Sequence, residues 1–476
     1  MRRTKIICTI GPASSPEDKI KGLISRGMNV ARLNFSHGTR EEHVHSISTL
    51  RRCAQELGAP LAILQDLQGP KMRIGSLKGG QRVLLDPGAE LTITTRPVVG
   101  NSRTLSTNYE NLPRDVKAGD CIFLADGLIE LEVLSVNDPD VRCRVVHGGI
   151  LAEHQGINLP HVSPSTPALT EKDREDLKLG LEHRVDYVAL SFVRGADDIR
   201  EVKGLISDLG VDAPVIAKLE TQEALENLAE ILSVVDGVMI ARGDLGVELS
   251  LEKVPMWQKR IIELANMNHI LVITATQMME SMIQSPHPTR AEASDVANAV
   301  LDGTDAVMLS GETAVGAYPL EAVEIMGRIV IEAESVASHS GHPSQSAVVE
   351  EFAHSLSYAA QQIVELNPSV TAIAVLTQTG LSARMVSKDR PKVPIFAFTP
   401  DPVVYNRLAL MWGVVPQMCG YMEDIEEIIA EVDRILREEG HVRAGQTVVF
   451  VGGLPLNVRG TTNFLRLHRL GAPSQR

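Results

Sequence analysis

Residues 185–219 read VDYVALSFVRGADDIREVKGLISDLGVDAPVIAKL, and this stretch indicates how the chain folds. It begins and ends with apolar, β-branched runs, 185–192 and 214–219, which are separated by an amphipathic segment of helical length. Runs that are apolar throughout are typical of parallel strands buried on both faces, and the segment between them supplies the connecting helix. The stretch therefore predicts one β/α unit of a parallel sheet.

The same pattern recurs along the chain and predicts eight strands in total. The other six runs are residues 5–10, 29–35, 61–67, 237–241, 270–275 and 305–309. Eight such units fit a (β/α)8 TIM barrel better than a doubly wound sheet, which usually has fewer strands. We therefore expect an α/β barrel with its functional residues at the carboxyl ends of the strands.

The segment between the third and fourth strands has a different pattern. Residues 71–167 contain short β-type runs separated by turn dipeptides, at 82–85, 90–95, 121–124, 128–136 and 141–147. They predict a small β-barrel domain inserted into a βα loop on the catalytic face, where it could close as a lid that excludes water. A passive insert is the alternative.

A separate α/β domain is predicted for residues 346–476. A helical segment at 351–365 is followed by strand-like runs at 370–376, 393–398 and 446–451, and the polar stretch 338–346 is the expected linker. The barrel would then be built in two parts, 1–70 and 168–345, with the lid domain at 71–167 and a regulatory domain at the C-terminal end.

The composition restricts the class of function. The net charge of −14 disfavours binding to nucleic acid or to an anionic membrane. The five cysteines form no C-x-x-C pair, which indicates reduced thiols. No signal peptide and no long apolar segment is recognised, so we expect a cytoplasmic protein that does not enter a membrane.

Charged residues follow the predicted fifth and sixth strands. Lys218 and Glu220 are two residues apart and project to the same side of a strand, while Asp244 follows the next strand. Two carboxylates completed by ligand oxygens and water suit Mg²⁺. The alternative is two buried ion pairs, Lys218 with Glu220 and Arg242 with Asp244.

Other strand ends carry polar residues as well. The second strand ends in RLNFSHG, residues 32–38, and the third in DLQGPKMR, residues 66–73, which concentrates cations where phosphate groups could bind. Solvent-exposed loops are the alternative. Thr276 follows the seventh strand, where its hydroxyl could contact a substrate carboxylate or a proton-relay water, although threonine is also a common strand residue. No Walker A loop and no G-x-G-x-x-G motif is present.

Five longer strings occur in order along the chain: TKIICTIGPA at 4–13, GMNVARLNFSHG at 27–38, ARGDLG at 241–246, ATQM at 275–278 and LSGET at 309–313. Together they closely resemble the pyruvate kinase family, and the resemblance extends in order over the barrel, the insert and the C-terminal domain. It implies a kinase dependent on Mg²⁺ or Mn²⁺ that transfers the phosphoryl group of phosphoenolpyruvate to ADP. The products would be pyruvate and ATP, in the last step of glycolysis.

The resemblance also implies roles for single residues. Lys218 would neutralise the phosphoryl group and the enolate left behind, and Arg32 would contact the transferring phosphoryl group. Thr276 would contact the substrate together with Gly243 and Asp244, and would lie close to the proton-delivery path. The positions that match the nucleotide side of the family site are Asn34, His37, Arg73 and Lys172.

The metal positions implied by the resemblance are Glu220 and Asp244 for Mg²⁺. The family's K⁺ pocket would be formed by Asn34, Ser36, Asp66 and the carbonyl of Leu67. Potassium-dependent members have a glutamate where this chain has Lys71. Because the Lys71 ammonium could supply the charge that K⁺ otherwise provides, we expect activity without added K⁺. The alternative is that Lys71 points to solvent and K⁺ still binds.

In the C-terminal domain, a strand-like run leads into Thr377, Thr379, Gly380 and Ser382, directly before a helical segment. Hydroxyls and backbone N–H groups in this position could hold a phosphate. The segment resembles the family's effector loop, which binds a sugar phosphate or AMP, and the loop 452–463 could cover it. An ordinary helix cap is the alternative. The resemblance further implies allosteric activation and a homotetramer.

Two other classes of function are weighed against this one. Another phosphoenolpyruvate-handling barrel, such as a carbon–carbon lyase, would share the metal carboxylates but would not need ADP. A metabolite-sensing or scaffold protein would bind ligands without turnover. The complete set of catalytic candidates favours the kinase: Arg32, Lys218, Glu220, Asp244 and Thr276.

Overall fold

The eight predicted runs form a closed barrel of parallel strands in the computed structural model, which describes residues 1–160, 162, 165–337, 351–456 and 462–471. The strands are β1 (Lys5–Thr9), β2 (Val30–Asn34), β3 (Ala62–Asp66), β12 (Tyr187–Leu190), β13 (Val215–Leu219), β14 (Gly237–Ala241), β15 (Leu271–Ala275) and β16 (Ala306–Leu309). Their order around the barrel is β1-β16-β15-β14-β13-β12-β3-β2. The predicted TIM barrel is therefore confirmed.

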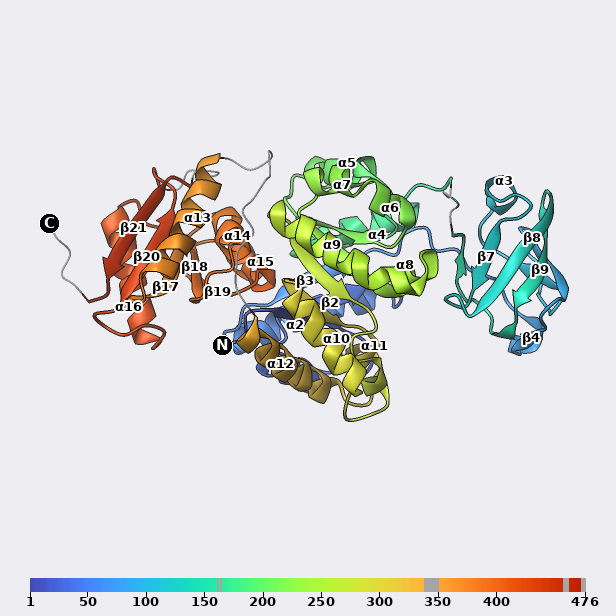
Figure 1. Cartoon of the computed structure of the whole chain (residues 1–476), viewed down its shortest axis with the longest axis horizontal. Coiled ribbons are helices and arrows are strands. Elements are labelled where there is room, and N and C mark those ends of the chain that lie inside the picture. Colours follow the sequence, from blue (N-terminus) through green and yellow to red (C-terminus); the bar gives the residue numbers. More distant parts are fainter. Residues whose placement is uncertain (161, 163–164, 338–350, 457–461, 472–476) are drawn as a thin grey trace.

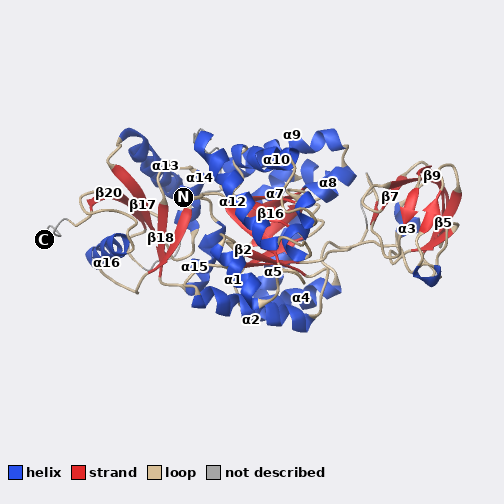
Figure 2. Ribbon diagram, turned by 90° about the horizontal axis from the view of Figure 1, so that it is seen from below, coloured by secondary structure: helices blue, strands red, loops and turns tan. Residues whose placement is uncertain are grey.

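Helices pack around the outside of the barrel, as Figure 1 and Figure 2 show. They are α1 (Glu17–Ser25), α2 (Arg40–Glu56), α4 (Glu171–Glu182), α5 (Ala196–Asp208), α6 (Gln222–Glu226), α7 (Leu228–Val234), α8 (Arg242–Glu248), α9 (Val254–Met267), α10 (Arg290–Leu301), α11 (Gly311–Ala314) and α12 (Pro319–Val336). Outward strand residues such as Ile63 and Val188 are fully buried beneath these helices. Thr39, Thr170 and Thr289 cap α2, α4 and α10 through their hydroxyls, so the sequence encodes these helix starts locally. Among the described helices, none is both long and apolar enough to cross a lipid bilayer.

The inward residues of the strands form a second apolar cluster. Ile216 belongs to it, and the cluster continues into the C-terminal domain. Two hydrogen bonds link the amino-terminal ends of strands to that domain, from Lys5 Nζ to Val414 O at 2.7 Å and from Tyr187 Oη to Arg407 O at 2.8 Å. The C-terminal domain therefore closes the floor of the barrel, and the carboxyl ends of the strands face away from it.

The insert lies on the opposite side of the barrel from the C-terminal domain (Figure 1). Its elements are β4 (Val83–Leu85), β5 (Glu90–Thr94), β6 (Thr104–Ser106), α3 (Leu112–Asp115), β7 (Cys121–Leu124), β8 (Ile129–Asn137), β9 (Asp140–His147), β10 (Gly149–Leu151) and β11 (Ile157–Asn158). The strands form a six-stranded sheet, β11-β7-β8-β9-β5-β6, and a two-stranded sheet, β10-β4. The largely β character is as predicted. The segment 72–75 pairs with both edges of the larger sheet, since the N–H of Ile157 in β11 donates to Met72 O at 3.0 Å and the N–H of Gly75 donates to Ser106 O in β6 at 2.8 Å. Backbone pairing therefore joins the two edges and closes the expected small barrel.

The C-terminal part is an α/β domain, as predicted. Its elements are α13 (Glu351–Leu366), β17 (Val370–Leu376), α14 (Leu381–Lys388), β18 (Ile395–Thr399), α15 (Pro402–Arg407), β19 (Val414–Met418), α16 (Ile425–Glu438), β20 (Thr447–Gly452) and β21 (Phe464–Arg469). The sheet order is β19-β18-β17-β20-β21, with β21 antiparallel to β20. The edge strands β19 and β21 come from segments without a predicted strand. The expected linker, 338–346, lies outside the described residues, and the domain boundaries stay predictions.

A buried group of charges joins the barrel to the C-terminal domain. Asp305, which directly precedes β16, pairs with Lys388 at the end of α14 and, at 2.8 Å, with Arg390. The side chains of Asp305 and Lys388 are fully buried. Burial lowers the pKa of Lys388 to about 8, although Asp305 opposes this shift. A carboxylate at this depth is stable only with such partners, so the group fixes α14 to the barrel floor.

Asp305→Asn should lower the free energy of unfolding by about 3–5 kcal/mol, because it leaves two buried cations without their counter-charge. Thermal unfolding measures the effect as a lower melting temperature. Glu263→Gln is the control, since Glu263 forms an exposed pair with Arg260 and such pairs contribute at most about 1 kcal/mol. Equal melting temperatures for the two variants would contradict the prediction.

Candidate active site

Charged side chains occupy inward positions at the carboxyl ends of neighbouring strands. In β13, Ile216 belongs to the apolar interior, so Lys218 and Glu220 face the same side above it. In β3, Leu64 belongs to that interior and Asp66 stands two residues later. The alternation that fills the barrel with apolar side chains therefore ends in charged ones at its mouth.

Lys218 lies at the centre of these charges. Its Nζ is 2.8 Å from Glu220 Oε1 and 3.4 Å from Asp66 Oδ1, and it donates to Ser191 Oγ at 2.7 Å. Arg32 contacts the other oxygen of Asp66 at 2.7 Å. The side chains of Lys218 and Arg32 are only 12% and 11% exposed, so two cations and two carboxylates form one largely buried network.

The network changes the acidity of its members. Burial raises the pKa of Asp66, but Lys218 and Arg32 outweigh this effect, so the pKa of Asp66 is below its usual value. Burial lowers the pKa of Lys218, but Asp66 and Glu220 reverse the shift and raise it. For Glu220, burial raises the pKa, and the nearby carboxylate of Asp244 adds to the increase despite Lys218. Asp66 and Lys218 are therefore held in their charged forms, while Glu220 and Asp244 repel each other.

This repulsion indicates where a divalent cation would fit. Asp244 lies in the first turn of α8, directly after β14, and lines the pocket between the barrel and the insert. Glu220 Oε2 accepts the backbone N–H of Phe192 at 2.7 Å, which orients the carboxylate. Two neighbouring carboxylates beside an open pocket could hold Mg²⁺ or Mn²⁺ with ligand oxygens and water completing the shell.

Thr276 lies in strained backbone after β15. Its φ is 66° and that of Gln277 is 53°, a left-handed region that β-branched residues rarely adopt. Thr276 Oγ1 accepts the N–H of Gly243 at 2.8 Å and donates to Ala275 O at 2.7 Å. Strain of this kind persists only where the surroundings hold it, and it is frequent at functional sites.

Arg242 does not form the ion pair with Asp244 that the alternative interpretation gave it. Arg242 contacts Asp295 at 2.7 Å and donates to Thr276 O at 2.8 Å. The other pair of that interpretation, Lys218 with Glu220, is present. Arg242 thus supports the strained turn at Thr276, and the Asp244 carboxylate is left to the pocket.

Basic side chains gather where the mouth meets the insert. Burial and the charges of Lys71, Arg73 and Arg32 lower the pKa of His37, so the three cations act on one place. Arg73 donates to His154 O in the insert at 2.8 Å. The charged stretches after the second and third strands are therefore brought together, as the sequence predicted.

Lys172 reaches the same region from α4. Its Nζ donates to Phe35 O at 2.8 Å and forms an ion pair with Asp176 at 2.5 Å. Phe35 directly follows β2, so Lys172 is tied to the loop that carries His37. The bond places an amine beside the predicted nucleotide positions.

The residues of the predicted K⁺ pocket also lie together. The pairing of β2 with β3 sets Asn34 opposite Asp66. Asn34 Oδ1 accepts the N–H of Ser36 at 3.1 Å, and the carbonyl of Leu67 accepts from Ser191 Oγ at 2.7 Å. The Asn34 amide oxygen, the Leu67 carbonyl and the Asp66 carboxylate therefore each have a protein partner.

Some residues of the mouth were not singled out from the sequence. Thr9 Oγ1 accepts from Arg32 at 3.0 Å, and Ser191 links Lys218 to β3. Thr9 ends β1 and Ser191 directly follows β12, each two residues after an inward apolar residue, so counting alternate residues could have found them. Glu248 on α8 lines the pocket, and burial followed by the charge of Asp244 raises its pKa to about 7. Its spacing of four residues from Asp244 was the only signal.

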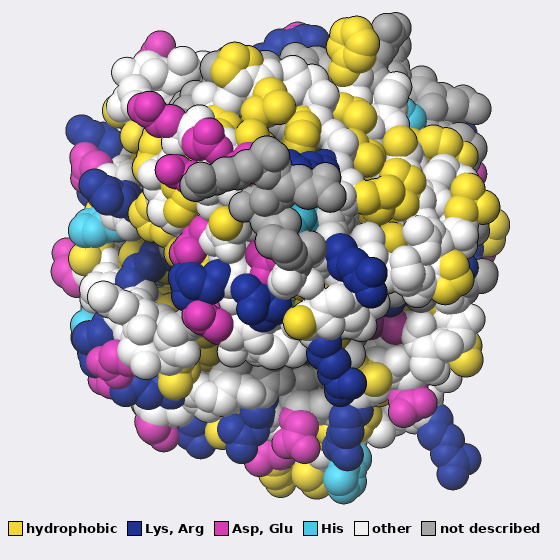
Figure 3. All heavy atoms as spheres, turned by 90° about the vertical axis from the view of Figure 1, so that its left-hand side faces the viewer, with side chains coloured by type: hydrophobic (Ala, Val, Ile, Leu, Met, Phe, Trp, Pro, Cys, Tyr) yellow, Lys and Arg dark blue, Asp and Glu magenta, His cyan; other side chains and the backbone are white. Residues whose placement is uncertain are grey.

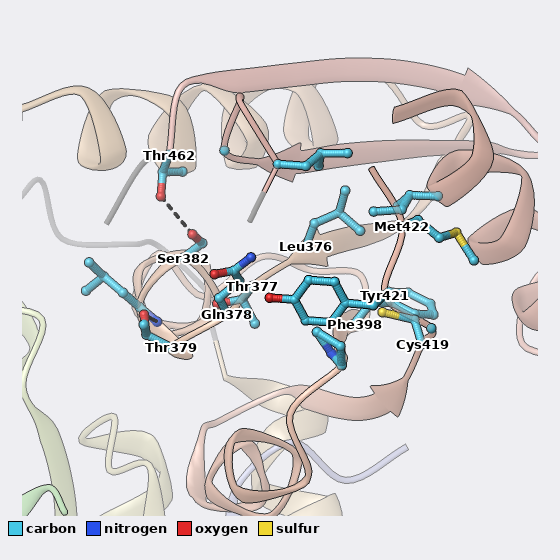
Figure 4. A pocket seen from close by; sticks show the side chains of 16 residues that line it. Leu376, Thr377, Gln378, Thr379, Ser382, Phe398, Cys419, Tyr421, Met422 and Thr462 are labelled. Atoms are coloured by element: carbon cyan, nitrogen blue, oxygen red, sulfur yellow. Dashed lines mark hydrogen bonds between the residues drawn. The ribbon is translucent and has the colours of Figure 1, made fainter. Parts of the chain in front are cut away.

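The second predicted site is a pocket in the C-terminal domain (Figure 4). Thr377, Thr379 and Ser382 line it, and Gly380, with a φ of 88°, is the N-cap of α14. Thr377 Oγ1 accepts the N–H of Gly380 at 2.9 Å, and Ser382 Oγ lies 2.7 Å from Thr462 Oγ1. The hydroxyls thus face a pocket. The hydrogen bond from Gly380 to Thr377 would also be present in an ordinary turn before a helix, so it fits the helix-cap alternative as well.

The rest of the pocket wall is apolar and aromatic. Phe398, Cys419, Tyr421 and Met422 line it across from the hydroxyls (Figure 4). A polar edge facing an aromatic wall suits a small ligand that carries both a phosphate and a ring. Of the predicted covering loop, residues 457–461 lie outside the described residues.

Comparisons with known proteins match the chain over nearly its whole length. The family model for the pyruvate kinase barrel domain matches residues 1–323, and that for the pyruvate kinase alpha/beta domain matches residues 353–468. "Pyruvate kinase 2" of Synechocystis sp. is 47% identical over 470 residues, covering 98% of this chain and 79% of that protein. The pyruvate kinase of Clostridium perfringens is 42% identical over 480 residues, covering 99% and 100%.

Solved structures agree with the sequence comparisons. A crystal structure of a pyruvate kinase from Cryptosporidium parvum superposes with a TM-score of 0.93 at 36% identity, covering 98% of this chain and 96% of that one. The similarity therefore extends over the barrel, the insert and the C-terminal domain together. With these matches added to the closed barrel and the charged network at its mouth, the chain belongs to the pyruvate kinase family.

Proposed function

We propose that this member of the pyruvate kinase family transfers the phosphoryl group of phosphoenolpyruvate to ADP at the barrel mouth. The products are pyruvate and ATP, in the last step of glycolysis. The observation that carries the proposal is the buried network in which Lys218 lies 2.8 Å from Glu220 and 3.4 Å from Asp66. Phosphoryl transfer depends on positioned positive charge more than on covalent help from the protein. In a chain with a net charge of −14, anionic reactants need such a local site.

Lys218 and Arg32 supply the fixed positive charge. The raised pKa of Lys218 keeps its ammonium protonated beside the phosphoryl group and the enolate that forms after transfer. Asp66 and Thr9 hold the Arg32 guanidinium at 2.7 Å and 3.0 Å, so it can face the transferring group without rearrangement. Charges already held in place stabilise a transition state more effectively than charges that must first reorient.

Glu220 and Asp244 are the proposed metal ligands. A Mg²⁺ or Mn²⁺ ion held between them would neutralise oxygens of the substrate and of the transferring phosphoryl group. The raised pKa of Glu220, to which Asp244 contributes, supports this assignment because a shared cation would relieve the repulsion between the carboxylates. Lys218 stays paired with Glu220 and limits the net negative charge of the site.

Thr276, Gly243 and Asp244 form the proposed substrate side. The Thr276 hydroxyl is fixed by its bonds to the N–H of Gly243 and the carbonyl of Ala275. A hydroxyl held in this way can position the group that protonates enolpyruvate at carbon, which gives pyruvate. The strained φ of 66° at Thr276 is consistent with a geometry kept for function.

The nucleotide side is assigned to the positions beside the insert: Asn34, His37, Arg73 and Lys172. The lowered pKa of His37 keeps its imidazole neutral at physiological pH, so it can accept or donate a hydrogen bond without adding charge. The cations around it can face the phosphates of ADP. The inserted domain would then close over the bound nucleotide as a lid.

Potassium is not required in this proposal. Lys71 lowers the pKa of His37, which directly follows Ser36 of the predicted K⁺ pocket, and we assign the Lys71 ammonium to that pocket. In that pocket Asp66 is already balanced by Lys218 and Arg32. A further monovalent cation would add positive charge where the chain supplies its own.

The C-terminal pocket is proposed as the site of a phosphorylated activator, a sugar phosphate or AMP. Thr377, Thr379 and Ser382 offer hydroxyls to a phosphate beside Gly380, the N-cap of α14. Aromatic side chains opposite them could stack on a ring (Figure 4).

A homotetramer and a cytoplasmic location are part of the same proposal. The outer face of the C-terminal domain shows apolar side chains among charges of both signs (Figure 3). Phe352 and Leu366 on α13 are 77% and 81% exposed, and Leu467 on β21 is 49% exposed. Exposed apolar side chains of this size support burial against another subunit.

Lys218→Met should reduce kcat at least about a hundredfold, because it removes a charge that stabilises the transition state. A coupled assay that detects ATP formed from phosphoenolpyruvate and ADP measures kcat. If the wild type formed no ATP in this assay, the proposed reaction would be refuted. Lys178→Met is the control, because Lys178 is 63% exposed on α4 and should not affect turnover. Near-wild-type turnover of Lys218→Met would overturn its role.

Lys71→Glu should make turnover depend on KCl, whereas the wild type should be equally active in sodium buffer with and without KCl. The substitution replaces the built-in ammonium with the carboxylate found in potassium-dependent members. Steady-state kinetics at constant ionic strength provide the measurement. Lys78→Glu makes the same charge change at an exposed position of the insert and should stay independent of KCl. A large increase in wild-type turnover on adding KCl would contradict the proposal.

Thr377→Ala should abolish activation by the phosphorylated effector, because a hydroxyl that faces the pocket is lost. Initial rates with sugar phosphates and AMP give the activation ratio. Asp401→Ala removes a different helix cap, at α15, where Asp401 accepts the N–H of Val403 at 2.8 Å. That control should lower the melting temperature and leave activation intact. A wild type that no compound activates, or a Thr377→Ala variant that responds normally, would disprove the effector site.

A further inference from the structure

Three side chains that can bind a metal meet between the barrel floor and the C-terminal domain. His269 lies between α9 and β15, His354 lies on α13, and Asp389 directly follows α14. One ligand atom of each residue lies within 4.8 Å of the ligand atoms of the other two. None of the three takes part in the proposed reaction, and they are too far apart in sequence to form a recognisable motif.

One side-chain polar atom in each of these three residues has no hydrogen-bond partner. His269 Nδ1, His354 Nε2 and Asp389 Oδ2 are all buried and unpaired. His269 and Asp389 are each only 3% exposed. Because a buried unpaired polar atom costs about 1–3 kcal/mol, three of them at one place indicate a shared partner.

The surroundings suit a metal ligand. Burial, followed by the nearby charges of His354, Lys388 and Arg384, lowers the pKa of His269 to about 3. A neutral imidazole carries a lone pair on one ring nitrogen, and His269 Nδ1 is buried without a partner. Lys388 is paired with Asp305 in the buried ion group at the barrel floor. Asp389 is the carboxylate of the cluster; burial raises its pKa to about 7, and it supplies negative charge when it is ionised.

The ligands are also held in orientation. The imidazole rings of His269 and His354 meet edge to face with their centroids 5.0 Å apart. The hydroxyl of Ser357 lies within hydrogen-bonding reach of the Asp389 carboxyl and, at 3.0 Å, of the backbone carbonyl of His354. Outer partners of this kind are usual around metal ligands.

We propose that His269, His354 and Asp389 bind one transition-metal ion, for which Zn²⁺ is the best chemical match. Two imidazoles, one carboxylate and a water form a common tetrahedral zinc set. Zinc–nitrogen distances of about 2.0–2.1 Å place ligand atoms roughly 3.4 Å apart, so binding draws the half-buried His354 inward. The ion would fasten α13 and the end of α14 to the barrel, apart from the divalent-cation site at the mouth.

Zinc binding is tested by equilibrium dialysis of the full chain, treated first with a chelator, against micromolar ZnCl₂. Millimolar MgCl₂ is kept in the buffer to occupy the carboxylates at the barrel mouth. The wild type should bind one zinc per chain. His354→Asn should weaken binding at least about tenfold, as should Asp389→Asn, because losing even an outer partner costs about 10–100-fold. His468→Asn is the control, since His468 pairs with Asp433 outside the cluster, and it should bind zinc as the wild type does.

Cobalt gives an independent readout. Tetrahedral Co²⁺ with imidazole ligands absorbs visible light much more strongly than octahedral Co²⁺ with oxygen ligands, which is the type expected at the barrel mouth. The strong band should appear for the wild type and for His468→Asn, and should be absent from His354→Asn and Asp389→Asn. Circular dichroism checks that the variants are folded. Equal zinc binding by the wild type and both cluster variants would overturn the proposal, and so would the absence of bound zinc in the wild type.

Discussion

The ion pair between Lys218 and Asp66, with Nζ and Oδ1 3.4 Å apart, is the contact on which the barrel mouth depends. Asp66 also binds Arg32, and Lys218 also binds Glu220, so each buried charge has a counter-charge. An isolated charge at this depth would lose its ionisation through a shifted pKa. The shared contacts instead keep Lys218 protonated and Asp66 ionised. Positive charge is thereby retained where little water competes with a substrate, which is where electrostatic contacts are strongest.

The barrel explains why the network lies at this place. Side chains alternate along each strand, so the row that contributes Ile216 to the apolar interior of β13 continues upward to Lys218 and Glu220. In β3 the same row passes from Leu64 to Asp66. Apolar layers below the charges exclude water, and the C-terminal domain closes the floor beneath them. One geometric rule therefore produces both the dry interior and the placement of the charges.

Features encoded in a local pattern could be predicted, and features that depend on distant partners could not. The run 237–241 coincides with β14 because a buried parallel strand needs uninterrupted apolar residues. The contact of Arg242 with Asp295 could not be predicted, because the two residues are 53 positions apart and no sequence spacing connects them. The edge strand β21, Phe464–Arg469, mixes charged with apolar residues and is defined by its antiparallel pairing with β20. The cluster around His269 likewise exists only in three dimensions.

Helix α14 connects the C-terminal pocket to the barrel floor. It begins after Gly380 at the pocket and ends at Lys388, which pairs with Asp305. Asp305 also accepts the N–H of Val272 in β15, the strand that leads to Thr276. With a rise of about 1.5 Å per residue, α14 is a short helix that can move as a rigid unit. A shift at its pocket end must therefore be accommodated at the buried ion group at its other end. A ligand can change the barrel by this route only if it binds two arrangements of α14 with different affinity. The buried charges favour discrete arrangements, because intermediate positions would separate Lys388 from Asp305 without water to replace the contact.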